Sequence, residues 1–299
     1  MSVGNGGEGS SKFKALISLA VAVFSVSWAS ILVVLSGAPG TVCAFWRLIF
    51  SSALTWIAVL MFKRGTRISL KIIVLTFLAG VCLAAHFAFW MESLFMVPVA
   101  ISTTVVNAHP LFSAFLGFMI LGERPRLLQL IGSVVGIVGI AELAFSTSRV
   151  VGEVGLFGVI YALVGALSVA AYFAVGRLLR REMDTLTYTG LVYSWASLIL
   201  LAYAILNKVD LIGYGLKSWL AFLALAVVPM MLGHTMLNYA LRYFSLIAVT
   251  TVTLGEPVGA AILAEFILKQ KCYAATYFSI ALTLFGIALT LIGERGKEA

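Results

Sequence analysis

Long apolar segments constrain the fold of this chain more than any other feature of its sequence. A membrane-spanning helix needs about 20 predominantly apolar residues. The chain has 299 residues, of which 62% are hydrophobic and 11% charged, and it divides into ten segments of roughly that length. Inside a bilayer every backbone polar group must be satisfied within the protein, so these segments are expected to be helices. The sequence therefore predicts an all-α integral membrane protein with ten transmembrane helices.

The predicted spans cover residues 14–35, 41–62, 70–91, 97–120, 126–146, 152–177, 186–206, 216–240, 246–268 and 273–293.

The basic residues indicate how these spans are oriented. With the N-terminus inside, fourteen of the 20 Lys and Arg residues lie on the cytoplasmic side and five on the outer side, while Arg47 lies within a span. This asymmetry follows the positive-inside rule. We predict a multi-pass protein of the cytoplasmic (plasma) membrane with both termini in the cytoplasm. The lipid bilayer is thus an expected partner, and the net charge of +8 requires no nucleic acid.

The remaining segments give no sign of catalytic chemistry. Residues 1–13 are rich in Gly and Ser and are predicted to be a disordered tail, and residues 294–299 form a short C-terminal tail. The three cysteines lie far apart without metal-ligand spacing. Phosphate-binding loops, zinc-protease helices and nucleophile elbows are absent from the sequence. We expect no metal, no cofactor and no enzymatic activity.

The two halves of the chain echo each other. His109-Pro110 in the fourth span and Glu256-Pro257 in the ninth are 147 residues apart, and the triplet GIA recurs at the same offset in the fifth and tenth spans. Each half has five spans, an odd number, so equivalent helices cross the membrane in opposite senses. The sequence predicts two inverted five-helix repeats, residues 14–150 and 151–293, an organisation typical of secondary transporters.

Four segments carry a resemblance to a known family: SVSWASILV (25–33), FWRLIFSSALT (45–55), NAHPLFSAFLGFMILGERP (107–125) and LGEPVGAAILAEFIL (254–268). Combined with ten spans, they resemble the drug/metabolite transporter superfamily, and within it the EamA-type ten-helix transporters. The resemblance implies a central cavity and export of small metabolites, often amino acids, driven by an ion gradient or by exchange. The second half departs from the pattern, with LKQ (268–270) where the first has LGE (121–123).

Glu256 is the most unusual acidic residue, because it lies near the middle of the ninth span. A carboxylate there must face the bundle interior, pair with a cation or be protonated. It is a candidate proton-coupling or substrate-amine site; the alternative is a structural acid bonded to a carbonyl that Pro257 leaves free. His109-Pro110, close to Asn107, is its counterpart, and both helices are expected to loosen there. His109 either contacts substrate or makes an interhelical hydrogen bond.

Imidazole, aromatic and amide side chains on other spans are further candidates for lining the substrate path. Helical spacing places several of them on shared faces, where they could stack on a planar or cationic substrate. The alternative for the aromatic residues is the interfacial belt. The candidates are His86, Trp90, His234, Asn238, Tyr239, Trp28 and Tyr172.

Other charged residues are assigned to the membrane surfaces. Arg47, Glu142 and Glu265 fall toward the outer leaflet and are predicted to form a structural or gating cluster, with snorkelling as the alternative. Glu123 and the basic run at 177–184 are expected to be solvated cytoplasmic ends.

These patterns favour a secondary active transporter that exports small polar metabolites by alternating access. Amino acids are the first expected substrates, and protons are the candidate coupling ion. The alternatives are an intramembrane enzyme acting on lipid and a passive channel or facilitator. Either a monomer or a homodimer is compatible with the sequence.

Overall fold

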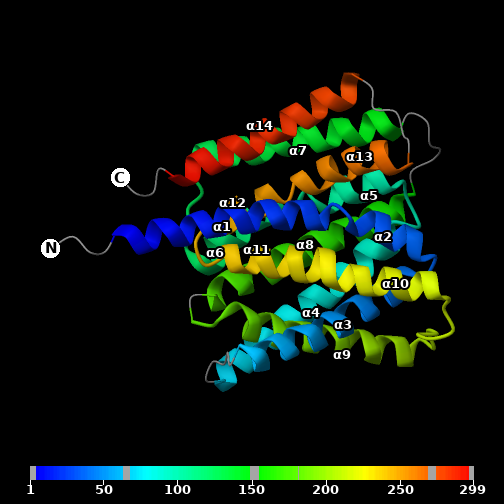
Figure 1. Cartoon of the computed structure of the whole chain (residues 1–299). Coiled ribbons are helices and arrows are strands. Elements are labelled where there is room, and N and C mark those ends of the chain that lie inside the picture. Colours follow the sequence, from blue (N-terminus) through cyan, green and yellow to red (C-terminus); the bar gives the residue numbers. More distant parts are fainter. Residues whose placement is uncertain (1–4, 63–67, 149–154, 181, 269–273, 296–299) are drawn as a thin grey trace.

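The computed structural model describes residues 5–62, 68–148, 155–180, 182–268 and 274–295. These residues form a helical bundle, with ten helices long and apolar enough to cross a membrane. The ten predicted spans are thus confirmed. Helix α1 begins and α14 ends at the same end of the bundle (Figure 1), referred to below as the terminal end. The opposite end is the distal end.

The helices of the first half are α1 (Asn5–Val26), α2 (Ala29–Ser36), α3 (Gly40–Met61), α4 (Leu70–Ser93), α5 (Val99–Val106), α6 (His109–Leu121) and α7 (Leu127–Ser148). Those of the second half are α8 (Leu156–Leu179), α9 (Thr185–Leu206), α10 (Leu216–Leu225), the π-helix η1 (Ala226–His234), α11 (Thr235–Ala240), α12 (Leu246–Val252), α13 (Gly255–Leu268) and α14 (Ala274–Arg295).

The N-terminal tail differs from its prediction. Helix α1 already begins at Asn5, so most of residues 1–13 are helical, and residues 1–4 lie outside the described part. The span that follows supplies a ready helical template, and extending a helix by one residue is far less costly than nucleating it. The glycines of this segment are therefore not enough to end the helix.

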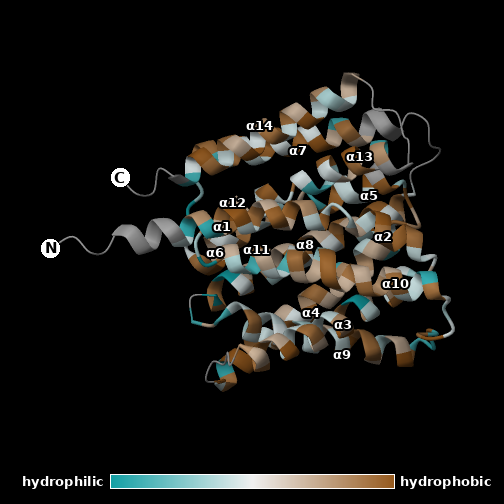
Figure 2. Cartoon of the chain, in the orientation of Figure 1, coloured by the Kyte–Doolittle hydropathy of each residue, from teal (hydrophilic) through white to brown (hydrophobic). Residues whose placement is uncertain are grey.

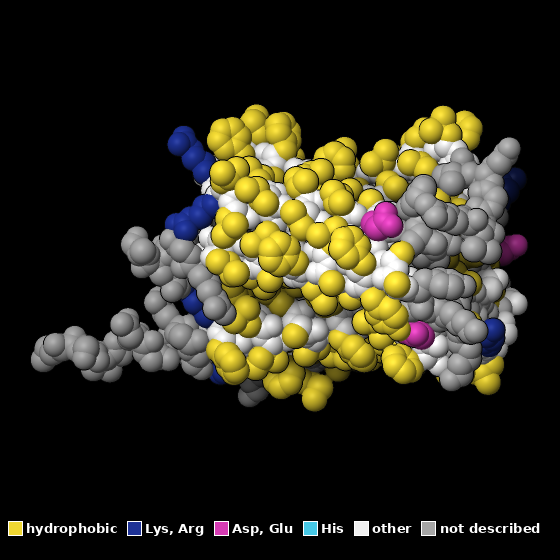
Figure 3. Space-filling view, turned by 90° about the horizontal axis from the view of Figure 1, so that it is seen from above, with side chains coloured by type: hydrophobic (Ala, Val, Ile, Leu, Met, Phe, Trp, Pro, Cys, Tyr) yellow, Lys and Arg dark blue, Asp and Glu magenta, His cyan; other side chains and the backbone are white. Residues whose placement is uncertain are grey.

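The outer surface of the bundle is suited to lipid. Large apolar side chains on several spans, among them Leu60, Phe115 and Phe285, are more than half exposed. Figure 3 shows these side chains as a broad belt, with Lys and Arg gathered toward the ends. Figure 2 shows hydrophilic residues mainly at helix ends and in connections. Many Ser and Thr side chains are buried between helices instead, and several donate to a carbonyl of their own helix, as Thr55 does to Ser51 at 2.7 Å.

The contacts between the halves follow a two-fold pattern. Helix α7 packs on α14, α3 on α9, and α6 on α12, each pairing equivalent spans of the two repeats. Helix α4 packs on α8, and the equivalent pair of helices, η1 and α1, also pack on each other. Five-helix repeats of opposite orientation produce this exchange of partners, so the two inverted repeats are observed as predicted.

Helices α7 and α14 approach each other at small residues. A Cβ atom built on Gly286 would lie only 2.3 Å from the backbone nitrogen of Gly136, and one on Gly132 would lie 2.6 Å from the carbonyl oxygen of Gly286. Side chains at these positions would force the helices apart. The small residues of α7 therefore serve packing within the chain.

Breaks interrupt three spans, and two of them are equivalent. The fourth span breaks at Asn107–Ala108, between α5 and α6, and the ninth at Thr253–Leu254, between α12 and α13. Pro110 and Pro257 follow directly, and each lacks the N–H that would bond to the carbonyl four residues earlier. The predicted loosening is confirmed in both helices.

The eighth span is distorted in another way. Pro229 lies inside η1, where the backbone adopts the wider π-helical turn that often marks functional sites. The hydroxyls of Ser51 and Thr235 donate to the carbonyls of Ala226 and Met230, both at 3.3 Å. The carbonyl of Met230 also accepts the backbone N–H of Thr235, so its bond to the Thr235 hydroxyl adds to the helical hydrogen bonding.

Candidate functional site

A cavity lies in the middle of the bundle where the two halves meet. Its empty volume, counted together with space open to the outside, is about 400 Å³, and its walls come from both repeats, including α1, α3, α4, α8 and η1. Most of its lining side chains are almost wholly buried, for example Arg47 at 0% exposure and His109 at 4%. Glu256 is the exception among these residues, because its side chain is partly exposed.

The broken helices supply the residues at one side of the cavity. His109 is the first residue of α6, and Glu256 lies in the first turn of α13. The two breaks meet through a hydrogen bond, 2.9 Å long, between His109 Nε2 and Thr253 Oγ1. Thr253 donates its own proton to the carbonyl of Thr250, so the imidazole is the donor and its Nδ1 is left without a partner. Asn107 also lines the cavity and donates to the carbonyl of Thr103 at 2.9 Å.

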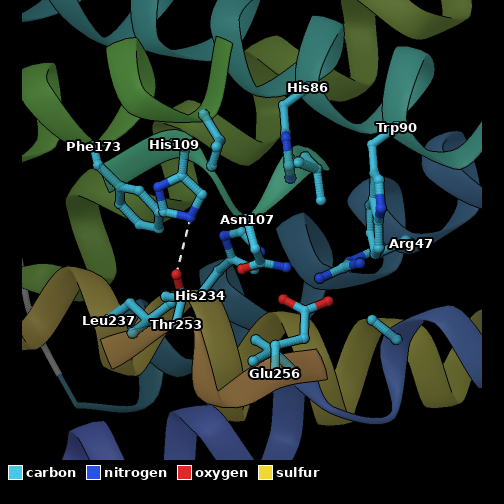
Figure 4. Close-up of a pocket in the computed structure, with 14 residues that line it drawn as sticks. Arg47, His86, Trp90, Asn107, His109, Phe173, His234, Leu237, Thr253 and Glu256 are labelled. Carbon is cyan, nitrogen blue, oxygen red and sulfur yellow. Dashed lines mark hydrogen bonds between the residues drawn. The ribbon is translucent and has the colours of Figure 1, made fainter. Parts of the chain in front are cut away.

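Arg47 and Glu256 face each other across the cavity (Figure 4). None of the three guanidinium nitrogens of Arg47 has a hydrogen-bond partner among the described residues, and Glu256 Oε1 also lacks one. The Arg47 guanidinium lies over the ring of Phe87, 4.1 Å from its centroid. A cation on an aromatic face is favourable but leaves its N–H groups unused. Arg47 and Glu256 are two of several polar groups in the cavity that lack a partner within the described part of the chain, together with Trp90 Nε1, His109 Nδ1 and His234 Nδ1.

Stacked rings form the rest of the polar wall. His86 stacks on Trp90 with centroids 5.7 Å apart, and His234 stacks on Phe173 at 5.9 Å. His86 Nδ1 donates to the carbonyl of Gly165 at 2.9 Å. The imidazoles of His86 and His234 lie 6.1 Å apart, one from each repeat. The structure thus brings together residues that are 148 positions apart in the sequence.

Other predicted residues lie outside the cavity lining. Asn238 and Tyr172 are hydrogen-bonded to each other behind it, and Asn238 also donates to the carbonyl of His234 at 2.7 Å. Tyr239 contacts Tyr243 with the ring planes tilted at 54°, and Trp28 contacts Phe24 edge to face. Neither Tyr239 nor Trp28 lines the cavity. Asn238 is placed to position His234, whereas the geometry gives Tyr239 and Trp28 no contact with the site.

The predicted outer-leaflet cluster does not form among the described residues. No ion pair joins Arg47 to Glu142 or Glu265, and Arg47 points into the cavity instead. Glu265 accepts a hydrogen bond from the hydroxyl of Tyr277 at 3.1 Å. The prediction was wrong because it counted depth along each helix and had no information on which face of the helix each side chain occupies.

Carboxylates tie the two repeats together at the terminal end. Glu123 accepts from Arg177 Nε at 2.7 Å and from the backbone N–H of Leu246 at 2.9 Å. Glu294 accepts from the backbone N–H of Ser245 at 2.9 Å and from Gln129 Nε2 of the first repeat at 2.7 Å. Both acids satisfy donors at the N-terminus of α12, where negative charge is also favoured by the helix dipole. This set of bonds is referred to below as the terminal clamp.

The terminal clamp corrects a second prediction. Glu123 and Arg177 were expected to be solvated, yet their side chains are only 10% and 12% exposed. Arg180, from the same basic run, is 2% exposed and donates to the carbonyl of Asn238 at 3.2 Å. Burial lowers the pKa of Arg180 to about 10, which leaves it protonated near neutral pH. Sequence position at a span end could not reveal that neighbouring helices cover these residues.

Several lining residues were not singled out from the sequence. Phe173 and Thr253 line the cavity, as do the apolar residues Val26, Ala29, Val106, Val169 and Leu237. Thr253 stands three residues before Glu256, within the helix break that Pro257 predicts. That break was the sequence signal that could have identified Thr253 as a lining residue. The apolar residues resemble any other buried residue of a span and carry no such signal.

The fold and the cavity agree with comparisons to known proteins. The sequence profile of the EamA-like transporter family matches residues 14–145 and again residues 156–292, once in each half. The chain belongs to the EamA-like transporter family. The double match fits the two-repeat layout, and the resemblance to the drug/metabolite transporter superfamily is confirmed.

Individual EamA-like relatives are distant. The uncharacterized transporter YwfM of Bacillus subtilis (strain 168) is 23% identical over 216 residues, which is 70% of each chain. A solved crystal structure, described only as that of a protein, aligns with a TM-score of 0.79 at 19% identity, over 96% of this chain and 99% of its own. That likeness concerns the fold alone. The family and the named relative make this EamA-like protein a transporter of the drug/metabolite type.

The described residues contain no group of three or more His, Cys, Asp or Glu side chains that could hold a metal ion. Figure 4 shows His109 beside Phe173 on one side of the cavity, and Arg47 beside Trp90 on the other. The EamA-like site therefore offers charge, hydrogen bonds and aromatic faces as its means of recognition.

Proposed function

We propose that this EamA-like protein is a secondary active transporter that exports small polar metabolites, amino acids first among them, by alternating access. The observation that carries the proposal is the central cavity at the junction of the two inverted repeats, with charged groups left unpaired at the point where two equivalent helices break. Such junctions are where inverted-repeat transporters bind substrate. A rocking motion of one repeat against the other would open the cavity to each side in turn.

The terminal clamp supports the gating part of the proposal. Its bonds join Glu123 and Gln129 of the first repeat to helices of the second, so it would hold the terminal end of the bundle closed. An alternating-access cycle requires a closure of this kind that forms in one state and breaks in another. The helix breaks at Asn107–Ala108 and Thr253–Leu254 provide flexible points in the moving spans.

Glu256 is the candidate coupling residue. Its carboxyl group lies at the cavity in the first turn of α13, and one oxygen lacks a hydrogen-bond partner. An acid inside a membrane protein is a functional candidate by default. Binding and release of a proton at Glu256 would link substrate movement to the proton gradient.

The test is uptake into proteoliposomes of a panel of radiolabelled amino acids and nucleosides, with and without a pH gradient. Wild-type protein is compared with Glu256→Gln and with Glu265→Gln, an acid in the same span that is absent from the cavity lining. Saturable uptake that responds to the gradient, and loses that response only in Glu256→Gln, is the expected result. Unsaturable flux of every compound would refute the carrier in favour of a channel.

A further inference from the structure

The unpaired guanidinium of Arg47 is the least expected feature of this membrane protein. The side chain is 0% exposed, and its three nitrogens carry five N–H donors that bond to none of the described residues. A buried donor without a partner costs free energy, and a buried charge costs more. Such a group persists in a folded protein when a ligand is to be bound there.

The geometry of a guanidinium selects its partner. Its planar fork of donors matches the two oxygens of a carboxylate better than it matches a single acceptor. Arg47 rests on the ring of Phe87, which covers one face of the guanidinium, and its side chain lines the cavity. The edge of the guanidinium carries the N–H groups, so the cavity presents a carboxylate-binding subsite.

Glu256 supplies the opposite charge on the facing wall. The two groups point toward each other, yet no ion pair of 4 Å or less joins them, and Glu256 Oε1 has no partner. The first turn of a helix favours a negative charge there. An ammonium group beside this carboxylate would satisfy it, as a carboxylate would satisfy Arg47.

Charge balance decides what kind of ligand fits both ends. A ligand with a net charge would satisfy one wall and leave the other charge unpaired at a buried site, which is costly. A zwitterion satisfies both and adds no net charge. Beyond Arg47 and Glu256, the described lining consists of imidazole, amide, hydroxyl and apolar groups, among them Val26, Val169 and Leu237. The ligand side chain would therefore be uncharged.

We propose that Arg47 and Glu256 form a two-point site for the backbone of a neutral α-amino acid, with Arg47 binding its carboxylate and Glu256 its ammonium group. This inference rests on the proposed transport function and specifies the substrate class and the role of each charge. In this site Trp90 and the apolar lining residues would enclose the side chain of the bound amino acid. Because most of the lining residues are almost wholly buried, we expect one repeat to move before an amino acid can enter.

Matched sets of compounds test the proposal on the wild-type protein. Each set holds an amino acid, the amine without its carboxylate and the acid without its amine: leucine, isoamylamine and isocaproate; phenylalanine, phenethylamine and hydrocinnamate; alanine, ethylamine and propionate. Binding to purified protein is measured by thermal stabilisation and by titration calorimetry, so no transport is required. We expect at least one amino acid to bind roughly 10- to 100-fold more tightly than either of its partners, as charge-assisted hydrogen bonds imply.

Variants of Arg47 separate binding from structure. Arg47→Gln should weaken binding of that amino acid roughly 10- to 100-fold, and Arg47→Lys, which keeps the charge without the fork, should weaken it less. Because Arg47 is unpaired in the empty protein, Arg47→Gln should unfold at a temperature no lower than wild type. Glu265→Gln is the control and should bind as wild type.

Three results would overturn the proposal: equal binding of an amino acid and its amine or acid, unchanged binding in Arg47→Gln, or a large fall in the unfolding temperature of empty Arg47→Gln. Binding of no member of any set would overturn it too. Saturable transport of nucleosides alone would refute the two-point site and leave the transporter proposal standing. Selective binding of an amino acid without any transport would support the two-point site and refute the transporter proposal.

Discussion

Replacing Glu123 by Gln should open the terminal end of the protein. Glu123 belongs to the terminal clamp, where one carboxylate oxygen accepts from Arg177 at 2.7 Å and the other from the N–H of Leu246 at 2.9 Å. Gln has one acceptor oxygen and no charge. The variant therefore cannot serve both donors, and it leaves Arg177 without its anionic partner.

The size of the effect follows from burial. The two side chains are 10% and 12% exposed, so solvent does not screen them as it would a surface pair. A hydrogen bond to a charged group contributes about 1.5–3 kcal/mol. If this free energy is lost only in the state closed at the terminal end, the ratio of open to closed protein rises roughly 10- to 100-fold.

Cysteine accessibility measures this ratio. Ser113 is fully buried on α6, between the central cavity and the terminal clamp. In a variant whose native cysteines are replaced, Ser113→Cys should react with a hydrophilic maleimide roughly 10- to 100-fold faster when Glu123→Gln is added. The comparison is made in purified protein at one temperature.

The chain offers a matched control in a second ion pair. Lys71 and Glu182 are 3.3 Å apart, but their side chains are 61% and 51% exposed. Glu182→Gln should change the labelling rate by little, because exposed pairs contribute about 0–1 kcal/mol. Equal labelling in wild type, Glu123→Gln and Glu182→Gln would refute the reasoning that the clamp holds this end closed.

Three further predictions concern packing and local structure. Gly286→Ala should lower the stability by about 1–3 kcal/mol in thermal unfolding, because its Cβ would lie 2.3 Å from the nitrogen of Gly136, whereas Gly215→Ala, with no atom within 4 Å, should not. Thr253→Val removes the hydroxyl that bonds His109 at 2.9 Å and should cost about 1 kcal/mol by the same measurement. Pro229→Ala restores a backbone donor inside η1, so hydrogen exchange of residues 226–234 should slow; unchanged exchange would contradict this.

The spans and the paired breaks could be predicted because each depends on local sequence. Apolar length identifies a span, and a proline removes one helical hydrogen bond wherever it stands. The break at Ser27–Trp28 has no such marker. The Ser27 hydroxyl donates to the carbonyl of Val23 at 2.7 Å, and Ser makes this bond in intact helices too.

Site residues could be predicted from the sequence only where a polar side chain stands out within an apolar span. Glu256, His109, Asn107, His86, His234 and Trp90 stood out for that reason and line the cavity. Arg47 stood out as well, but its partner could not be assigned, since that depends on how α3 and α13 are rotated. The buried positions of Glu123 and Arg177 depend on contacts between helices far apart in the sequence, which no local pattern encodes.

The two repeats are equivalent in arrangement but not in detail, and the difference has a consequence for the proposed alternating-access cycle. The eighth span contains the π-helix η1, while its counterpart α4 is regular; the first span breaks at Ser27–Trp28, while its counterpart α8 is continuous. Identical repeats would give inward- and outward-facing states of equal free energy. Because these repeats differ, the proposed alternating-access cycle would have inward- and outward-facing states of unequal free energy, and the empty protein would rest in the lower one.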